Sequence, residues 1–410
     1  MRITYNKFEL ELNSFLKTYL EDKSFDHLQE RLNLPDQKYN STSKIINEYY
    51  REQLNIDDHQ SKDRITIDRI ITFSQIRLNS EKFAIFLIEL AHICLSEGKL
   101  DIASEIFRKA NKHTNNNQTK AETLLGMADV FSCRAKWSKS LDTLKKAKSL
   151  FKSAADDRGL AKCENVLGTI YGELGDISKA KKHFLTSLSL INRDKDLDLT
   201  ASLYTNLGIV NNIQGYHSDS LNHLNKALNI YNRLNKLKNA AEVNLNIGIV
   251  NLDSGNYPDA IAVLDSAIDV SKNENFISTL CIAYHIKSQV LIKLKDFYYA
   301  SEFANKALEM SHDLDDRLTV ADIYKVKGII ERHLGNYRIA ETNLLNSLRI
   351  NESMSNEMNI AETSFELGLL YEKMNDSPLS NTYLMKSKEY YQNIESPLKV
   401  ERIDAILAFS

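Results

Sequence analysis

The sequence predicts an all-α protein in which pairs of helices repeat and stack into a solenoid. Glycine and proline are scarce, with 13 and four copies in 410 residues, which argues against a β-rich fold full of tight turns. Nine of the 13 glycines lie on two phases of one 40-residue period, seven residues apart. The two sets are Gly168, Gly208, Gly248, Gly328 and Gly368, and Gly175, Gly215, Gly255 and Gly335. A fixed period of this length is typical of proteins whose units pack only on their neighbours.

The residues around these glycines repeat on the same period. The segment LGTIYGELGDISKAKKHFLTSL begins at Leu167, and related segments begin at Leu207, Ile247, Lys287, Lys327 and Leu367. Two looser copies begin at Leu90 and Met127. We therefore expect eight repeats.

Each unit reads as two helices joined by a turn. The first helix has apolar residues at helical spacing, such as Leu203 and Val210, and a turn such as Gly215-Tyr216 follows it. The second helix carries a small residue and then a large one, at Ala180, Ser220, Ala260, Ala300 and Ala340 and at Phe184, Leu224, Leu264 and Leu344. Glycine inside the first helix costs about 1 kcal/mol relative to alanine. We infer that a side chain there would collide with the packed neighbour.

The first 80 residues lack glycine and do not follow the period, so we expect a separate small helical domain over residues 1–80. Apolar stripes predict four helices, with a loop near residues 57–62. The stripes are Phe8, Leu12, Phe15, Leu16 and Tyr19; Phe25, Leu28 and Leu32, ended by Pro35; Ile45, Ile46, Tyr49 and Tyr50; and Ile67, Ile70, Ile71 and Ile76. This domain is either a cap for the solenoid or a docking module for an effector. A DNA-binding helix-turn-helix is disfavoured, because 12 basic residues are balanced by 13 acidic ones.

The rest of the chain forms two further segments. Residues 81–395 are expected to form the solenoid of eight repeats, and residues 396–410, around Pro397, one more helix. That helix would cover the apolar face of the last repeat, which otherwise meets water.

The repeat resembles the tetratricopeptide repeat over about residues 84–395. The shared pattern is a Leu-Gly pair, a Gly-Tyr turn, and then an alanine, a large apolar residue and a second alanine. The resemblance implies a right-handed α-solenoid of about eight helix pairs, with a concave face lined by the first helices. Units of 40 rather than 34 residues are similar to those of kinesin light chains and of bacterial peptide-sensing regulators of the Rap and PlcR type. The departures are Ser288 for the first glycine, Asn375-Asp376 for the Gly-Tyr turn, and no tryptophan early in the first helix.

The composition is that of an ordinary soluble protein, with 43% hydrophobic residues, 26% charged residues and a formal net charge of −3. This charge balance disfavours nucleic acid as a partner. The N-terminus shows no apolar signal core, and the most apolar stretch, residues 83–95, is too short to cross a bilayer. The four cysteines form no CxxC pair and lie in helical stretches: Cys94, Cys133, Cys163 and Cys281. We therefore expect a cytoplasmic protein without membrane insertion.

The sequence carries no catalytic or metal-binding motif. It has no GxxxxGK[ST] loop, no GxGxxG after a strand, no HExxH helix and no GxSxG elbow. Ten histidines are scattered, and His217 and His223 are six residues apart, which places them on different helix faces. Trp137 takes the aromatic position of its turn, where packing explains it. We expect no enzymatic activity, no cofactor and no metal site.

The residues that line the concave face follow from the helical period. With the first glycine as position 8 of each repeat, positions 2, 5, 6, 9 and 12 share one stripe of the first helix. The polar candidates for a protein- or peptide-binding groove are Lys162, Asn165, Thr205, Asn206, Asn212, Asn246, His285, Gln289, Lys325 and Arg332. The apolar candidates on the same stripe are Ile209, Leu245, Ile249, Ile286 and Ile292. A half-apolar groove suits a guest with hydrophobic anchors.

Asparagine is the most informative of these residue types, because it can pair with the C=O and the N–H of a peptide unit together. In kinesin light chains and peptide-sensing regulators an asparagine at this position contacts peptide backbone, and the resemblance implies this role for Asn206 and Asn246. Asn165 and Asn212 extend the set by their place on the stripe. A high asparagine content throughout the chain is the competing explanation. Lys162 with Asn206 is only a fragment of the carboxylate clamp of chaperone-binding relatives.

The predicted function is a non-catalytic scaffold or adaptor that binds another protein or peptide in its groove. One alternative is a peptide-responsive intracellular regulator of the Rap and PlcR kind, in which residues 1–80 relay the signal. Another alternative is a structural subunit of an effector complex.

Overall fold

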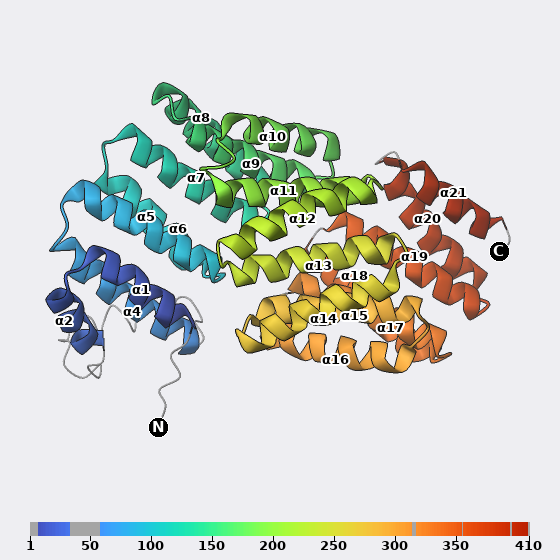
Figure 1. The fold of residues 1–410 in the computed structure, drawn as a ribbon. Coiled ribbons are helices and arrows are strands. Elements are labelled where there is room, and N and C mark those ends of the chain that lie inside the picture. The colour runs from blue at the N-terminus through green and yellow to red at the C-terminus, as the bar shows by residue number, and fades with distance from the viewer. Residues whose placement is uncertain (1–6, 33–57, 314–316, 355, 394–395, 409–410) are drawn as a thin grey trace. The chain divides into compact units, whose positions relative to one another are not determined.

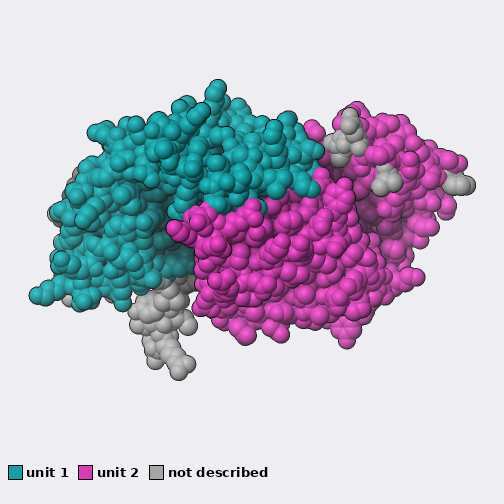
Figure 2. All heavy atoms as spheres, turned by 45° about the horizontal axis from the view of Figure 1, so that its top comes forward, with its two compact units in different colours: residues 1–191 teal, residues 192–410 magenta. Residues whose placement is uncertain are grey.

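A computed structural model describes residues 7–32, 58–313, 317–354, 356–393 and 396–408. Within these ranges the chain forms 20 helices and no strand, so the prediction of an all-α repeat fold is confirmed (Figure 1). The chain divides into two compact units, residues 1–191 and residues 192–410 (Figure 2).

Three helices begin unit 1, namely α1 (Lys7–Tyr19), α2 (Asp22–Leu32) and α4 (Asp58–Gln75). Their predicted apolar stripes lie in or against a hydrophobic core, with the exception of Ile76, which follows the end of α4 and is 77% exposed. The loop predicted near residues 57–62 is wrong for residues 58–62, which begin α4. This polar stretch contains neither glycine nor proline to stop a helix. Pro35 and the helix predicted around residues 45–50 lie outside the described residues.

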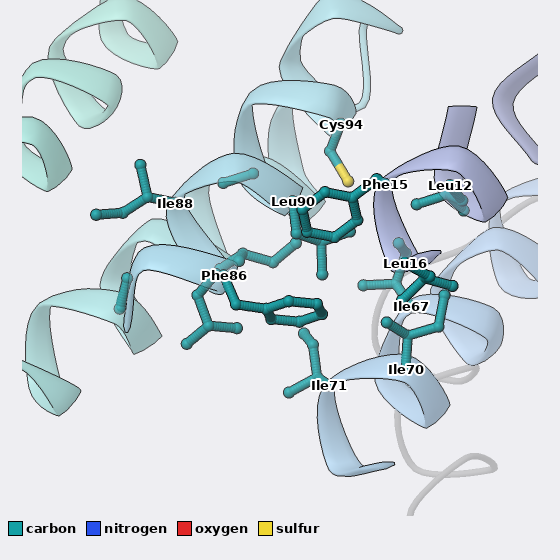
Figure 3. Packing of buried hydrophobic residues seen from close by; sticks show 14 of the residues in the cluster. Leu12, Phe15, Leu16, Ile67, Ile70, Ile71, Phe86, Ile88, Leu90 and Cys94 are labelled. Atoms are coloured by element: carbon teal, nitrogen blue, oxygen red, sulfur yellow. The ribbon is translucent and has the colours of Figure 1, made fainter. Parts of the chain in front are cut away.

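The N-terminal helices share one core with the first helix pair, α5 (Ser80–Ser96) and α6 (Leu100–His113). Figure 3 shows Phe15 of α1 beside Phe86 of α5, and their ring centroids are 5.0 Å apart. Burying side chains of this size contributes roughly 1.5–3 kcal/mol each. The domain boundaries at residues 80 and 395 stay predictions.

The remaining helices form pairs of first and second helices. Unit 1 continues with α7 (Asn117–Cys133) and α8 (Trp137–Ser153), and α9 (Asp157–Glu173) and α10 (Ile177–Leu190). Unit 2 contains α11 (Leu197–Ile213) and α12 (His217–Arg233), α13 (Leu237–Asp253) and α14 (Tyr257–Asn273), α15 (Ile277–Lys293) and α16 (Phe297–Asp313), α17 (Arg317–His333) and α18 (Tyr337–Ser353), α19 (Glu357–Lys373) and α20 (Ser377–Asn393), and a last helix, α21 (Pro397–Leu407).

A residue with left-handed backbone ends most of the first helices. In α11, Gly215 has φ 82° and donates to Asn212 O across 2.9 Å, and Tyr216 N donates to Asn211 O across 2.8 Å. This arrangement satisfies carbonyls that the helix end would leave unpaired. Asn375 takes the same backbone with φ 59°, which asparagine tolerates better than most residues. The last repeat therefore keeps its turn without glycine.

The glycines at position 8 lie against the second helix of their own pair. A Cβ atom on Gly208 would come within 2.6 Å of Leu224 Cγ, and one on Gly168 within 2.5 Å of Phe184 Cε1. The collision inferred from the sequence is confirmed. In the repeat that carries Ser288, residue 304 is alanine where the other repeats of unit 2 have leucine, and Ser288 Oγ donates to Ala300 O across 2.8 Å.

Candidate functional site

The first helices of each unit form its inner side. Within each unit, each first helix contacts the first helix of the next repeat, whereas the second helices pack mainly on first helices. In unit 1 the row consists of α5, α7 and α9, and in unit 2 it consists of α11, α13, α15, α17 and α19. The closer approach of first helices gives each stack a concave face, which we call the inner face.

All ten predicted polar residues are half-buried and lie on first helices. Lys162 and Asn165 belong to α9 in unit 1. The other eight belong to unit 2: Thr205, Asn206, Asn212, Asn246, His285, Gln289, Lys325 and Arg332. The structure therefore distributes the predicted set between the inner faces of two units.

Position 9 forms a row of half-buried side chains along unit 2. Its members lie on five consecutive first helices: Ile209, Ile249, Gln289, Ile329 and Leu369. Four of them are aliphatic side chains that are neither enclosed nor fully exposed. We call these five residues the position-9 row.

Two of the predicted apolar groove residues do not face the groove. Leu245 is 5% exposed and Ile286 is 3% exposed, and both belong to one buried cluster of unit 2. Positions 5 and 6 lie at the edge of the stripe, where α13 meets α15, so a large apolar side chain there is enclosed between repeats. Ile292 is half-buried.

The polar residues on α11 and α13 make local hydrogen bonds. Asn246 Nδ2 donates to Glu242 O of its own helix across 3.1 Å, and Thr205 Oγ1 donates to Ala201 O across 3.0 Å. Asn212 Nδ2 donates to Asp253 Oδ2 of the next first helix across 2.7 Å. Asn212 therefore links two repeats. The hydrogen bond from Asn246 uses only its side-chain NH2 group, so the side-chain carbonyl oxygen takes no part in that contact.

His285 and Gln289 form a pair on α15. Gln289 Nε2 lies 2.8 Å from His285 Nε2, so the imidazole accepts at Nε2 and carries its proton on Nδ1. His285 Nδ1 is buried and has no hydrogen-bond partner in the described residues. Burial lowers the pKa of His285 to about 4, with Lys325 adding to the effect and Asp322 opposing it. The ring is neutral at pH 7 and presents a donor that a carbonyl oxygen would satisfy.

Charged residues on α17 and α19 form ion pairs between repeats. Lys325 Nζ lies 2.7 Å from Glu362 Oε2 and 3.2 Å from Asp322 Oδ1. Burial alone would lower the pKa of Lys325, but these two carboxylates outweigh it and hold the pKa above its usual value. Arg332 Nη2 lies 2.6 Å from Glu366 Oε2. A ligand that engages either cation competes with a carboxylate already in place.

Unit 1 has a smaller polar cluster on its inner face. Lys162 Nζ of α9 lies 2.9 Å from Glu122 Oε1 of α7. Burial raises the pKa of Asp129, also on α7, to about 7, although the charge of Lys162 opposes the rise. Burial lowers the pKa of His92 on α5, and Lys162 lowers it further.

The sequence analysis did not select four of these residues: Glu122, Asp129, Glu362 and Glu366. Positions 2, 6 and 9 identify them once the stripe is extended to the repeats at residues 121 and 361. The signal that could have found them is the same 40-residue period.

No group of three His, Cys, Asp or Glu side chains within the described ranges is arranged to hold a metal ion. No helix in the described part of the chain has both the length and the apolarity needed to span a membrane. Cys94, Cys163 and Cys281 are buried, whereas Cys133 at the end of α7 is exposed.

Comparison with known families now adds to this geometry. The family described as tetratricopeptide repeat matches residues 160–233 and 199–273. The chain has the tetratricopeptide-repeat fold. The match covers the helices from α9 to α14, and the remaining helix pairs of the described chain follow the same two-helix plan. No curated protein matches the sequence.

Several solved structures resemble this chain at low sequence identity. A Rap protein complexed with competence and sporulation factor has a TM-score of 0.59 and 13% identity, covering 80% of this chain and 97% of that one. NprR in complex with its cognate peptide NprX has a TM-score of 0.57 and 14% identity, covering 78% and 98%. A signal transduction ATPase with a tetratricopeptide repeat sensor, from Pyrococcus horikoshii, has a TM-score of 0.59 and 15% identity, covering 97% of this chain and 66% of that one. At these identities the likeness concerns the fold.

Proposed function

We propose that this protein is a non-catalytic scaffold that binds another protein or a peptide on the inner face of unit 2. The observation that carries the proposal is the position-9 row, with four half-buried aliphatic residues and Gln289 at 40-residue intervals. An extended or helical guest with apolar side chains would bury these residues. Asn206 and Asn246 stand three residues before Ile209 and Ile249, where they can contact the backbone of the same guest.

Two buried hydrogen-bond donors also support the inner face of unit 2 as the binding surface. His285 Nδ1 and Arg332 Nε are buried without hydrogen-bond partners in the described residues, on consecutive first helices. Both are donors, and a peptide carbonyl is an acceptor. Two of the solved structures with this fold are complexes, one of a Rap protein with competence and sporulation factor and one of NprR with a cognate peptide. A cytoplasmic location and a role as adaptor are parts of this proposal.

The test compares two double variants after the partner has been isolated from native lysate. Asn206→Ala with Asn246→Ala removes two inner-face amides, and Asn225→Ala with Asn229→Ala removes two exposed amides on α12. We expect the inner pair to weaken binding by about tenfold or more, which corresponds to one or two lost hydrogen bonds, with unchanged helical circular dichroism. The α12 pair should bind as the wild type does. Equal affinity of all three proteins would show that the inner face is not the binding surface.

A second candidate function is a peptide-responsive regulator. The observation that favours it is the single core shared by α1, α4, α5 and α6, through which a shift of the first repeats would reach the N-terminal helices. Small-angle scattering with and without the bound partner separates the two functions. A regulator predicts a change in the dimensions of the protein, and a static scaffold predicts none.

A further inference from the structure

A pocket of about 610 Å³ lies in unit 1, beside the first repeat. Helices α4, α6 and α7 line it. Its apolar lining consists of Ile67, Ile71, Ile102, Ile106 and Met127. Figure 3 shows Ile67 and Ile71 on α4, at the edge of the core that joins the N-terminal helices to the first repeat. The volume falls within the range of about 300–1,000 Å³ that is typical of small-molecule sites.

The charged residues around the pocket are mainly basic. Arg64 Nη2 lies 2.5 Å from Glu105 Oε2, so this pair is neutral overall. Three other cations stand on α6: Arg108, Lys109 and Lys112. None of the three has a carboxylate within ion-pair distance in the part of the chain that the structure describes. Among the described residues of the lining, the only other acidic group is Asp68.

Lys109 is a half-buried cation in the lining of the pocket. Burial lowers the pKa of Lys109, and the carboxylate of Asp68 offsets the effect only in part. Burial also raises the pKa of Asp68 itself, while the charges of Arg64 and Lys109 oppose the rise. An anion beside Lys109 would stabilise its charged form.

We propose that this pocket binds a small amphipathic anion, a carboxylate carried on an apolar body. The isoleucines and Met127 would surround the apolar body, and Lys109 would pair with the carboxylate. Arg108 and Lys112 would add further positive charge near the carboxylate. Both parts of the ligand are needed. An apolar body without charge leaves Lys109 unpaired, and a bare carboxylate makes no contact with the isoleucines and Met127.

Octanoate, octanol and acetate are the probes that separate these contributions. Isoleucine methyl NMR on the full chain reports the site directly, because four isoleucines line the pocket. We expect octanoate to shift the methyl signals of Ile67, Ile71, Ile102 and Ile106, and to leave that of Ile268, buried in unit 2, unchanged. Acetate should produce no shift, and octanol should bind more weakly than octanoate by about tenfold or more.

The matched variants are Lys109→Met and Lys146→Met. Methionine keeps the apolar stem of lysine and removes its charge, and Lys146 is an exposed lysine on α8 that lies outside the pocket. Lys109→Met should weaken octanoate by about tenfold while leaving octanol unchanged, and Lys146→Met should change neither. The same methyl spectra confirm that both variants are folded.

Three outcomes would overturn the proposal. One is the absence of shifts at the four isoleucines at millimolar octanoate. Another is binding of octanol as tight as that of octanoate. The third is an equal effect of Lys109→Met and Lys146→Met on octanoate.

Discussion

Lys325 Nζ donates to Glu362 Oε2 across 2.7 Å, and this contact joins the first helices of two successive repeats, α17 and α19. Lys162 and Glu122 make the equivalent link between α9 and α7 in unit 1, at 2.9 Å. The inner faces therefore serve two purposes, since the side chains that would receive a guest also connect neighbouring repeats. In an array where each unit contacts only its neighbours, such links act directly on the coupling between repeats.

Glu362→Gln should destabilise the protein by about 1–3 kcal/mol, because it removes the main partner of a lysine whose side chain is 12% exposed. Asp322 remains beside Lys325, which keeps the loss below that of a fully unpaired buried charge. The control is Glu352→Gln, which breaks an exposed pair with Lys386 on second helices. That change should stay within about 0.5 kcal/mol. Urea unfolding at pH 7 measures both, and equal midpoints for the two variants would refute the structural role of the inner pair.

Gly168→Ala and Gly172→Ala, both in α9, should have opposite effects. A Cβ on Gly168 would lie 2.5 Å from the ring of Phe184, whereas one on Gly172 would meet only Ala180 Cβ at 3.9 Å. Overpacking at residue 168 should cost about 1–2 kcal/mol net. The gain in helix propensity at residue 172 should stabilise the protein by about 0.5–1 kcal/mol. Thermal unfolding compares the two, and a stabilising Gly168→Ala would contradict the packing described for the repeat.

His285→Gln should remove an acid-sensitive contribution to the stability of unit 2. The folded pKa of His285 is lowered to about 4, while the unfolded chain takes up the proton near pH 6.5. The unfolded state therefore binds more protons between these values, and stability falls as the pH drops from 6.5 to 4. We expect a loss of at most about 2 kcal/mol, because the side chain is only half-buried by its exposed area. Urea midpoints across this pH range should fall less steeply in the variant than in the wild type.

Asp129→Asn should remove a contribution to the stability of unit 1 that has the opposite pH dependence to that of His285. The pKa of Asp129 is raised to about 7 in the folded state, whereas the unfolded chain loses the proton near pH 4. The folded state therefore binds more protons in this window, and the stability gained from the protonated carboxyl is lost as the pH rises from 4 to 7. The variant should be more stable than the wild type at pH 8 and should lose this slope. An unchanged slope would show that Asp129 is ionised in the folded protein.

The sequence predicted the repeat because one physical constraint recurs in every unit. The side chain of Leu224 occupies the space that a Cβ atom on Gly208 would need. The same pair recurs as Gly248 with Leu264 and as Gly328 with Leu344. The stripe of the inner face was predictable for a similar reason, since the helical period alone places its members on one side of the first helix.

The partners of the stripe residues were less predictable. Glu362 and Glu366 reach Lys325 and Arg332 from the following repeat, and the pattern within a single helix does not specify which side chains meet across that interface. Leu245 was assigned to the groove because of its position, yet the approach of α13 to α15 encloses it. The loop predicted near residues 57–62 was wrong for residues 58–62, because a polar stretch without glycine or proline remains compatible with a helix.

The most direct measurement of the central claim is site-specific photo-cross-linking to the bound partner. A photoreactive phenylalanine analogue replaces Gln289 in the position-9 row in one protein, and Asn229, exposed on α12, in the other. If the inner face of unit 2 holds the guest, residue 289 gives a covalent adduct with the partner and residue 229 does not. An adduct from residue 229 alone would place the guest on the outer helices and contradict the account.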